Sequence, residues 1–302
     1  MILSVVIITH NEEANIGRTL ASVQPLVADG KGEIEIIVVD SGSTDRTVEI
    51  AKSLGARVFI EEWKGYAAQK NSAIDKAEGA WILSLDADEE LESSLTAELL
   101  FLFPDQAPTD SHAARLERVK RLTYLSSPQT RRQLRRIRKA QGDPDSIFVA
   151  FSGFLIRRRN FFLGRWIKHG GFWPDPKLRL FHKGSGHFEE RLVHEDVKLT
   201  EGITSQLKHA IIHHSYPTLA DYIDHMNRYS SLGAEMAVAS GPRGFSLFNI
   251  VLRPVATFIY NYFFRLGFLD GREGLLLHLY HAVYVSWKYA KAWELARKKE
   301  ST

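Results

Sequence analysis

The sequence predicts an α/β fold, in which a mainly parallel central sheet is flanked by helices. Short apolar runs typical of buried strands alternate with stretches of helical periodicity. Acidic residues directly follow two of these runs, at the strand ends where open α/β sheets bind ligands. The four runs are residues 2–8, 34–39, 57–60 and 80–85. Because they lack polar alternation, we expect both faces of the sheet to be covered.

The stretches between the strands have the start and stop signals of helices. Asn11 is placed to cap the first helix, and Ser43 or Thr44 can begin the second. The third, residues 66–77, is rich in alanine and ends before Gly79, which is a plausible stop. The order β-α-β-α-β-α-β implies parallel strands joined by right-handed crossovers.

Two acidic segments follow the second and fourth strands. Asp40 lies in the first segment, and the second contains an Asp-x-Asp pair, Asp86 and Asp88. Mg²⁺ usually takes one or two carboxylates together with substrate oxygens. The pair can therefore share a divalent cation with a phosphate-bearing ligand, which predicts a nucleotide-diphosphate site.

Further polar residues are expected at the same crevice. Thr9, Asn11 and Glu12 come just past the first strand, so they can line it. Lys70, on the third helix, could approach a phosphate as a point charge. These four residues are candidate donor-binding residues.

Each assignment has a structural alternative. An aspartate at a strand end, such as Asp40, can serve an Asx-turn or a helix cap. Asp86 and Asp88 could belong to a solvated acidic loop, because three glutamates follow closely. Lys70 could lie on the polar face of its helix.

The chain resembles family 2 glycosyltransferases, which have the GT-A fold. Four segments in the expected order carry the resemblance: residues 6–13 (Val-Ile-Ile-Thr-His-Asn-Glu-Glu), 39–45 (Val-Asp-Ser-Gly-Ser-Thr-Asp), 69–71 (Gln-Lys-Asn) and 86–89 (Asp-Ala-Asp-Glu). Segments 164–166, 170–175, 179–181 and 193–195 are similar to the lipopolysaccharide core β-1,4-glucosyltransferase branch. The resemblance covers about residues 1–103 and 150–235.

The resemblance implies an inverting, metal-dependent enzyme that uses a UDP-sugar, with UDP-glucose as the leading donor and Mg²⁺ or Mn²⁺ as the cofactor. Asp88 is the first candidate metal ligand. Asp86 would orient the ribose or the metal's water shell, and is the second candidate ligand. Asp40 would accept hydrogen bonds from the base. The implied acceptor is a membrane-associated glycolipid such as a lipopolysaccharide core.

Other functions stay open at this point. Within enzymes, the acceptor could be a polyprenyl phosphate. From a different class, the chain could be a catalytically silent nucleotide-sugar-binding protein or a membrane scaffold that has kept the fold, because fold alone does not fix function.

Inverting transfer needs a base that takes the proton of the acceptor hydroxyl. Glu195 is the first candidate and Asp196 the second, because the resemblance implies an acidic residue across the site from the Asp-x-Asp pair. Glu189, Glu190 and Asp175 remain possible. A surface ion pair is the structural alternative for Glu195.

Basic residues and histidines of the same region are further candidates. His194, His213 or His214 could add a nitrogen ligand to the metal, although a lone histidine is more often structural. Lys177 and Arg179 could hold the diphosphate, unless they lie on an exposed strand face.

We expect a catalytic domain over residues 1–240, which includes a basic helical insertion at about 105–146. Between residues 112 and 139 there are ten Lys or Arg residues and one acidic residue, so the local field is positive. This insertion could hold anionic lipid headgroups, or it could be a solvated helix pair. Nucleic acid is disfavoured, because aromatic residues are nearly absent there.

Residues 241–302 are predicted to form an amphipathic helical segment. Residues 245–268 are rich in aromatic and aliphatic side chains but are interrupted by arginines, asparagine and proline, which disfavours a membrane span. Aromatic residues flanked by cations suit the bilayer interface. We expect peripheral attachment to the inner face of the cytoplasmic membrane; packing against the catalytic domain or a dimer partner is the alternative.

Composition agrees with a cytoplasmic enzyme. The 302 residues are 44% hydrophobic, enough for a sizeable core, and the formal net charge of +3 names no partner. The absence of cysteine excludes disulfides, thiolate metal sites and a cysteine nucleophile. The first residues lack the features of a secretory signal. Oligomeric state stays open.

Overall fold

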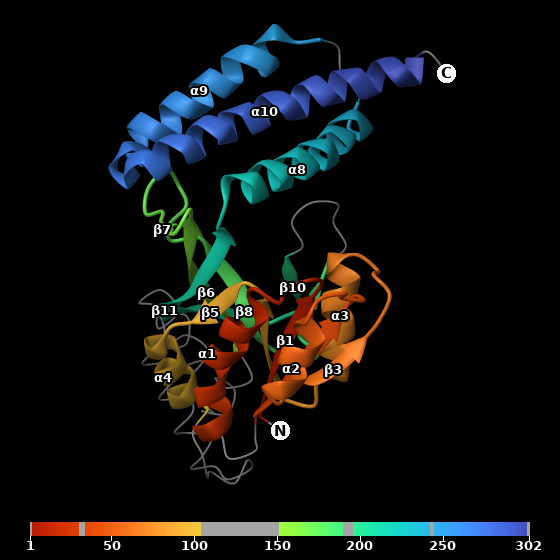
Figure 1. The fold of residues 1–302 in the computed structure, drawn as a ribbon, viewed down its shortest axis with the longest axis vertical. Helices are drawn as coiled ribbons and strands as arrows, with labels where there is room; N and C mark the ends of the chain where they lie inside the picture. Colours follow the sequence, from red (N-terminus) through yellow and green to blue (C-terminus); the bar gives the residue numbers. More distant parts are fainter. Residues whose placement is uncertain (1, 30–33, 104–150, 190–195, 242–244, 301–302) are drawn as a thin grey trace, which may run out of the picture. The chain divides into compact units, whose positions relative to one another are not determined.

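The computed structural model describes most of the chain (Figure 1), namely residues 2–29, 34–103, 151–189, 196–241 and 245–300. The chain forms two compact units. The first comprises residues 1–158, 176–190 and 195–213, and the second comprises residues 159–175, 191–194 and 214–302. The division predicted at residue 240 stays a prediction. The predicted basic insertion lies outside the described residues.

The first unit begins with four parallel strands in the order β3-β2-β1-β4. They are β1 (Leu3–Thr9), β2 (Ile34–Asp40), β3 (Arg57–Ile60) and β4 (Trp81–Asp86). The four predicted strands and their parallel direction are confirmed, with each end within one residue of the prediction. Thr9 pairs with Asp40 and Ile8 with Asp86, so the polar residues that follow these strands come to one edge of the sheet.

The remaining strands make the sheet mixed. They continue it beyond β4 in the order β8-β6-β11-β5. The pairs β4–β8, β8–β6 and β11–β5 are antiparallel. Their bounds are β5 (Glu89–Leu91), β6 (Phe151–Phe162), β8 (Pro176–His182) and β11 (Ile203–Tyr216). The short β7 (Arg165–Trp166) pairs with β6, while β9 (Gly186–Phe188) and β10 (Val197–Leu199) form a separate pair.

Helices cover both faces of the parallel strands, as the apolar runs predicted. They are α1 (Ile16–Asp29), α2 (Thr47–Ser53), α3 (Tyr66–Lys76) and α4 (Ser93–Leu102). Side chains alternate along a strand, so Val5 and Ile7 of β1 pack with α1 and α4, whereas Val6 packs with α3. Two buried apolar layers therefore hold the sheet, and the carboxyl edge of its strands stays polar.

The predicted starts of the first two helices are wrong. α1 begins at Ile16, and Asn11 does not cap it. The backbone of Asn11 is left-handed (φ 54°), and its side chain accepts a hydrogen bond from the Thr44 amide at 2.9 Å. α2 begins at Thr47, whose amide donates to Asp45 at 3.0 Å. Asn and Asp side chains that bond to a neighbouring loop offer its backbone an alternative to the helix, which explains both differences.

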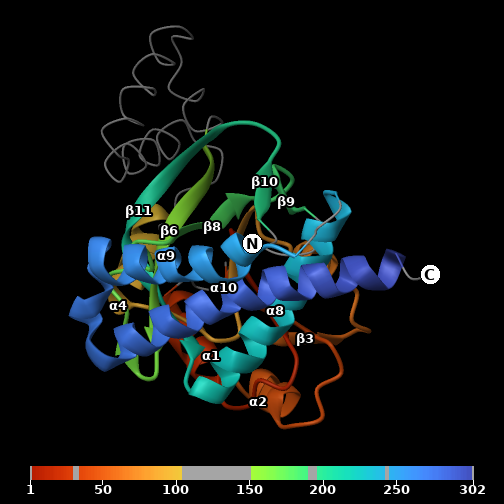
Figure 2. The ribbon, with the colours of Figure 1, turned by 90° about the horizontal axis from the view of Figure 1, so that it is seen from above.

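The second unit is dominated by three helices. They are α8 (Leu219–Ala239), α9 (Arg253–Ile259) and α10 (Gly271–Glu300). α9 continues at both ends into short π-helical segments, Phe248–Leu252 and Tyr260–Phe264. A 3₁₀-helix at Gly267–Asp270 precedes α10. α10 lies between α8 and α9 in Figures 1 and 2 and contacts both. No helix in the described ranges is long and apolar enough to cross a membrane.

Candidate active site

Asp40 joins the end of β1 to the loop after β2. The Asp40 carboxylate accepts hydrogen bonds from the Thr9 hydroxyl (2.9 Å), the Gly42 amide (3.0 Å), and the Ser43 amide (2.8 Å) and hydroxyl. Asp40 is buried, and both of its oxygens are engaged. It therefore acts as the Asx-turn acceptor that the structural alternative describes, and a base contact would have to be made beside these bonds. Its role in base recognition stays a prediction.

Carboxylates gather at this edge of the sheet. Burial raises the pKa of Glu12, and the charges of Asp88, Asp45 and Asp86 raise it further, against a hydrogen bond from Asn15 that lowers it. Glu12 thus lies within electrostatic reach of both members of the Asp-x-Asp pair. Such a concentration of negative charge favours a bound cation.

Two cations hold Asp86. Lys70 Nζ lies 2.9 Å from Asp86 Oδ1, and Arg179 Nη2 donates to Asp86 Oδ2. Burial raises the pKa of Asp86, but the charges of Arg179 and Lys70 outweigh it and hold this pKa well below its usual range. Asp86 is therefore an anion already neutralised by protein side chains, which favours a positioning role over direct metal binding.

Arg179 links Asp86 to a second carboxylate. Its Nη2 also donates to Glu89 Oε1 at 2.6 Å, and Arg158 Nη1 lies 3.4 Å from the same oxygen. Arg179 and Glu89 are both buried. The Glu89 carboxylate in turn accepts a hydrogen bond from the Asp86 amide at 3.0 Å. Glu89 thus holds the Asp-x-Asp segment through the Asp86 amide and through Arg179.

These contacts revise two expectations about the pair's surroundings. In the alternative of a solvated acidic loop, the glutamates after Asp88 would face water, but Glu89 is buried within the cluster of Arg179. Lys70 also is buried and contacts Asp86, so the polar-helix-face alternative is wrong for this side chain. Glu89 is the site residue that sequence reasoning missed. Its position directly after Asp88 in the sequence was the available signal.

Asp88 has a histidine partner. His213 Nε2 on β11 lies 3.3 Å from Asp88 Oδ2, because β11 pairs with β5 and places His213 opposite Glu89. Burial raises the pKa of Asp88, but His213 lowers it by charge and hydrogen bonding, and the net shift is downward. The carboxylate and the imidazole can both face one divalent cation.

The donor set suits a divalent metal that also binds phosphate. Among the described residues no group of three His, Asp or Glu side chains is arranged to hold a metal. Mg²⁺ commonly takes only one or two protein carboxylates, with substrate phosphates and water supplying the rest. Asp88 supplies one such carboxylate, and His213 beside it can add a nitrogen ligand. His214 instead contacts the ring of Phe161, with 5.6 Å between ring centroids.

The candidate bases fall in different places. Glu190, His194 and Glu195 lie outside the described residues. Asp196 is exposed, and its carbonyl accepts a hydrogen bond from the Glu189 amide at 3.3 Å. Glu189 pairs with Lys198 at 2.8 Å, and Asp175 accepts a hydrogen bond from Asn160 at 3.0 Å. Lys177 is half-buried on β8.

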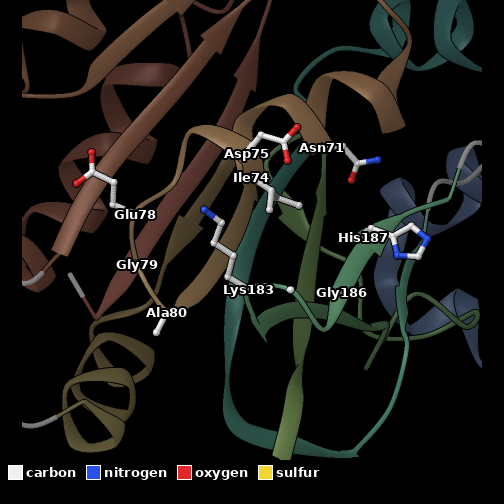
Figure 3. Close-up of a pocket in the computed structure, with 10 residues that line it drawn as sticks. Asn71, Ile74, Asp75, Glu78, Gly79, Ala80, Lys183, Gly186 and His187 are labelled. Carbon is white, nitrogen blue, oxygen red and sulfur yellow. The ribbon is translucent and has the colours of Figure 1, made fainter. Parts of the chain in front are cut away.

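A pocket in the first unit lies away from the acidic edge. Figure 3 shows that residues from the end of α3, the segment 78–80 and the β8–β9 turn line it. Residues 78–80 precede the first residue of β4, whereas Asp86 is its last. Lys183 is turned to this pocket's wall, where it donates to the Ala77 carbonyl. By position, this pocket is not where a ligand of the Asp-x-Asp pair would bind.

Comparison with known proteins gives a family match over more than half of the chain. The model of the family described as "Glycosyl transferase family 2" matches residues 4–163. That range includes Glu12, Asp40, Lys70 and both aspartates of the Asp-x-Asp pair.

Several individual proteins are similar to the chain. An uncharacterized glycosyltransferase of Rickettsia typhi is 28% identical over 99% of this chain and 89% of its own length. The lipopolysaccharide core biosynthesis glycosyltransferase LpsC of Rhizobium meliloti is 26% identical over 97% of this chain and 92% of its own length. A dolichyl-phosphate hexose transferase of Haloferax volcanii is 36% identical over 34% of this chain and 43% of its own length.

Proposed function

The chain belongs to glycosyl transferase family 2 and has the GT-A fold, and from that membership we propose an inverting enzyme that uses a UDP-sugar. UDP-glucose is the proposed donor. A membrane-associated glycolipid such as a lipopolysaccharide core is the proposed acceptor. The observation that carries the proposal is the convergence of Asp86, Asp88 and His213 at the carboxyl edge of the sheet. The similarity to LpsC supports the acceptor class.

Asp88 and His213 would hold a Mg²⁺ or Mn²⁺ ion, and Asp86, fixed by Lys70 and Arg179, would orient the ribose. When bound, the ion offsets the negative charge that develops on the departing diphosphate. Glu12, which follows β1 at the same edge of the sheet, would complete the wall of the crevice with Thr9.

The acceptor hydroxyl needs a base, and Glu195 is the proposed one, with Asp196 second. We expect Glu195→Gln to lower kcat by about 10²–10⁴-fold, the usual contribution of a positioned base, without weakening UDP-sugar binding. Steady-state transfer assays and nucleotide titrations measure the two quantities. Glu201→Gln, at an exposed glutamate six positions later in the sequence, is the matched control. Near-normal transfer by Glu195→Gln would pass the assignment to Asp196.

The proposed function is tested with nucleotide sugars in the presence and absence of Mn²⁺. A ligand that binds the native state raises its stability according to concentration and affinity. We expect UDP-glucose with Mn²⁺ to raise the melting temperature more than either alone, and the protein to hydrolyse or transfer the sugar slowly. Nucleotide binding without turnover against any acceptor extract would support the silent sugar-binding protein instead.

A polyprenyl phosphate is the second candidate acceptor. The partial similarity to a dolichyl-phosphate hexose transferase supports it, over about a third of the chain. Both acceptors are lipids, so we propose peripheral attachment to the inner face of the cytoplasmic membrane in either case. Incubation with lipid-linked core oligosaccharide and with polyprenyl phosphate separates them, because only the true acceptor gains the sugar.

A further inference from the structure

We infer that the second unit docks on anionic phospholipid through one side of the helical segment 248–264. Phe248, Leu252, Val255, Ile259, Phe263 and Phe264 form this side, here called the apolar stripe. The first five are three or four residues apart, which places them along one side of a helix, and Phe264 directly follows Phe263 at the end of this side. This inference deepens the membrane attachment proposed above, because it names the surface and the lipid chemistry.

The apolar stripe faces solvent. Its side chains are between 42% (Ile259) and 76% (Phe264) exposed. A helix on the surface of a globular protein usually turns its polar side to water and its apolar side to the core. Soluble proteins rarely expose contiguous apolar patches of this extent unless the patch binds something. The apolar stripe is therefore expected to bind a partner.

The helix already packs on α10 through its other side. Pro254 is buried, the Ser286 hydroxyl donates to the Ile250 carbonyl at 2.8 Å, and Arg253 donates to the Tyr289 hydroxyl at 2.5 Å. Figures 1 and 2 show α9 lying alongside α10. Packing within the described part of this unit thus accounts for the inner side and leaves the apolar stripe uncovered.

The positive charge around the apolar stripe indicates an anionic binding partner. Arg265 and Arg272 are exposed just after the segment, whereas Arg253 is held by Tyr289 of α10. The acidic residues nearby are buried or paired. Asp270 is buried and accepts a hydrogen bond from the His169 amide at 2.8 Å, and Glu273 lies 3.6 Å from Arg165. The described surface at the stripe is therefore apolar and positive.

Such a surface complements a bilayer with anionic headgroups. Phenylalanine and aliphatic side chains enter the boundary between headgroups and acyl chains, while arginines contact the phosphates. A second copy of the chain fits less well. A two-fold symmetric dimer would bring the same positive surface against itself.

Vesicle flotation with the full chain tests the inference. We expect at least tenfold more protein to float with vesicles of phosphatidylcholine and phosphatidylglycerol than with phosphatidylcholine alone. The double variant Phe248→Ser with Phe264→Ser should lose at least tenfold of that binding. Its matched control is Ile60→Ser with Trp63→Ser, because those side chains, in the first unit, are 64% and 50% exposed. UDP-induced thermal stabilisation of each variant reports an intact nucleotide site.

The outcomes separate the possibilities. Equal flotation of the stripe variant and its control would overturn the inference. So would a wild-type dimer, seen by light scattering, that the stripe substitutions dissociate while no form of the protein binds vesicles. Flotation that depends on the stripe, in a protein that turns over no nucleotide sugar, would support the docking surface and contradict only the proposed function.

Discussion

Asp88→Asn is expected to lower sugar transfer by on the order of 10³-fold while the protein stays folded. The amide keeps the shape of the side chain but removes the charge that would bind the divalent cation with His213. Asp88 is half-buried in the turn between β4 and β5, so the uncharged side chain of the variant stays partly in contact with water. The loss should fall on catalysis and on Mn²⁺ affinity, with little change in the free energy of unfolding.

Three measurements check this prediction. Transfer rates, the Mn²⁺ concentration for half-maximal rate, and urea unfolding are compared with those of Asp75→Asn. Asp75 is an exposed carboxylate on α3, so its variant removes the same charge elsewhere in the first unit. Equal activity of the two variants would remove Asp88 from the site. A rate loss that matches a loss of fold would make its role structural.

Arg179→Met should destabilise the protein by about 3–5 kcal/mol, the usual cost of removing one partner from a buried ion pair. The variant leaves the buried Glu89 carboxylate with the 3.4 Å contact to Arg158 as its cationic partner in the described cluster, beside the hydrogen bond from the Asp86 amide, and leaves Asp86 with Lys70. Because Arg179 depresses the pKa of Asp86, the stabilisation is present above the pKa of Asp86 in the unfolded chain and is lost as pH falls below it. The deficit should thus be full at neutral pH and shrink below about pH 4.

Urea unfolding at pH 7 and below pH 4 measures the deficit. Arg179→Lys keeps a charge but not the geometry that reaches two carboxylates, so we expect an intermediate loss. Arg46→Met is the matched control. Arg46 pairs with Glu49 on the surface, so its removal should leave the free energy of unfolding almost unchanged. If Arg179→Met behaves like that control, the buried cluster does not contribute as its geometry indicates.

Local sequence patterns predicted the parallel half of the sheet well. Strands β1 to β4 are short apolar runs, and the helices between them leave periodic signals, so each element could be found without knowing its partners. The strands β6, β8 and β11 carry charged residues and histidines, and their patterns are of intermediate burial over part of their length. Their pairing depends on distant partners, which local periodicity does not reveal.

The candidate site was predicted in outline, and its contacts were not. The position of Asp86 and Asp88 at a strand end followed from the order of strand and motif. Spacing could not reveal that Arg179 binds Asp86 and Glu89, because alternation along a strand fixes a side but not a partner. For the same reason His213 was one of three equal candidates until the pairing of β11 with β5 placed it beside Asp88.

The pairing of β11 with β5 also bears on how the protein is made. Asp88 leaves the ribosome early, yet its imidazole neighbour is residue 213, so 125 residues separate the two in the chain. Closing so long a loop carries an entropic cost, and contacts of this range form late in folding. A nascent chain that ends before β11 holds the complete parallel strands β1 to β4 but lacks half of the Asp88–His213 pair. The proposed metal site would therefore be complete only near the end of synthesis of the first unit.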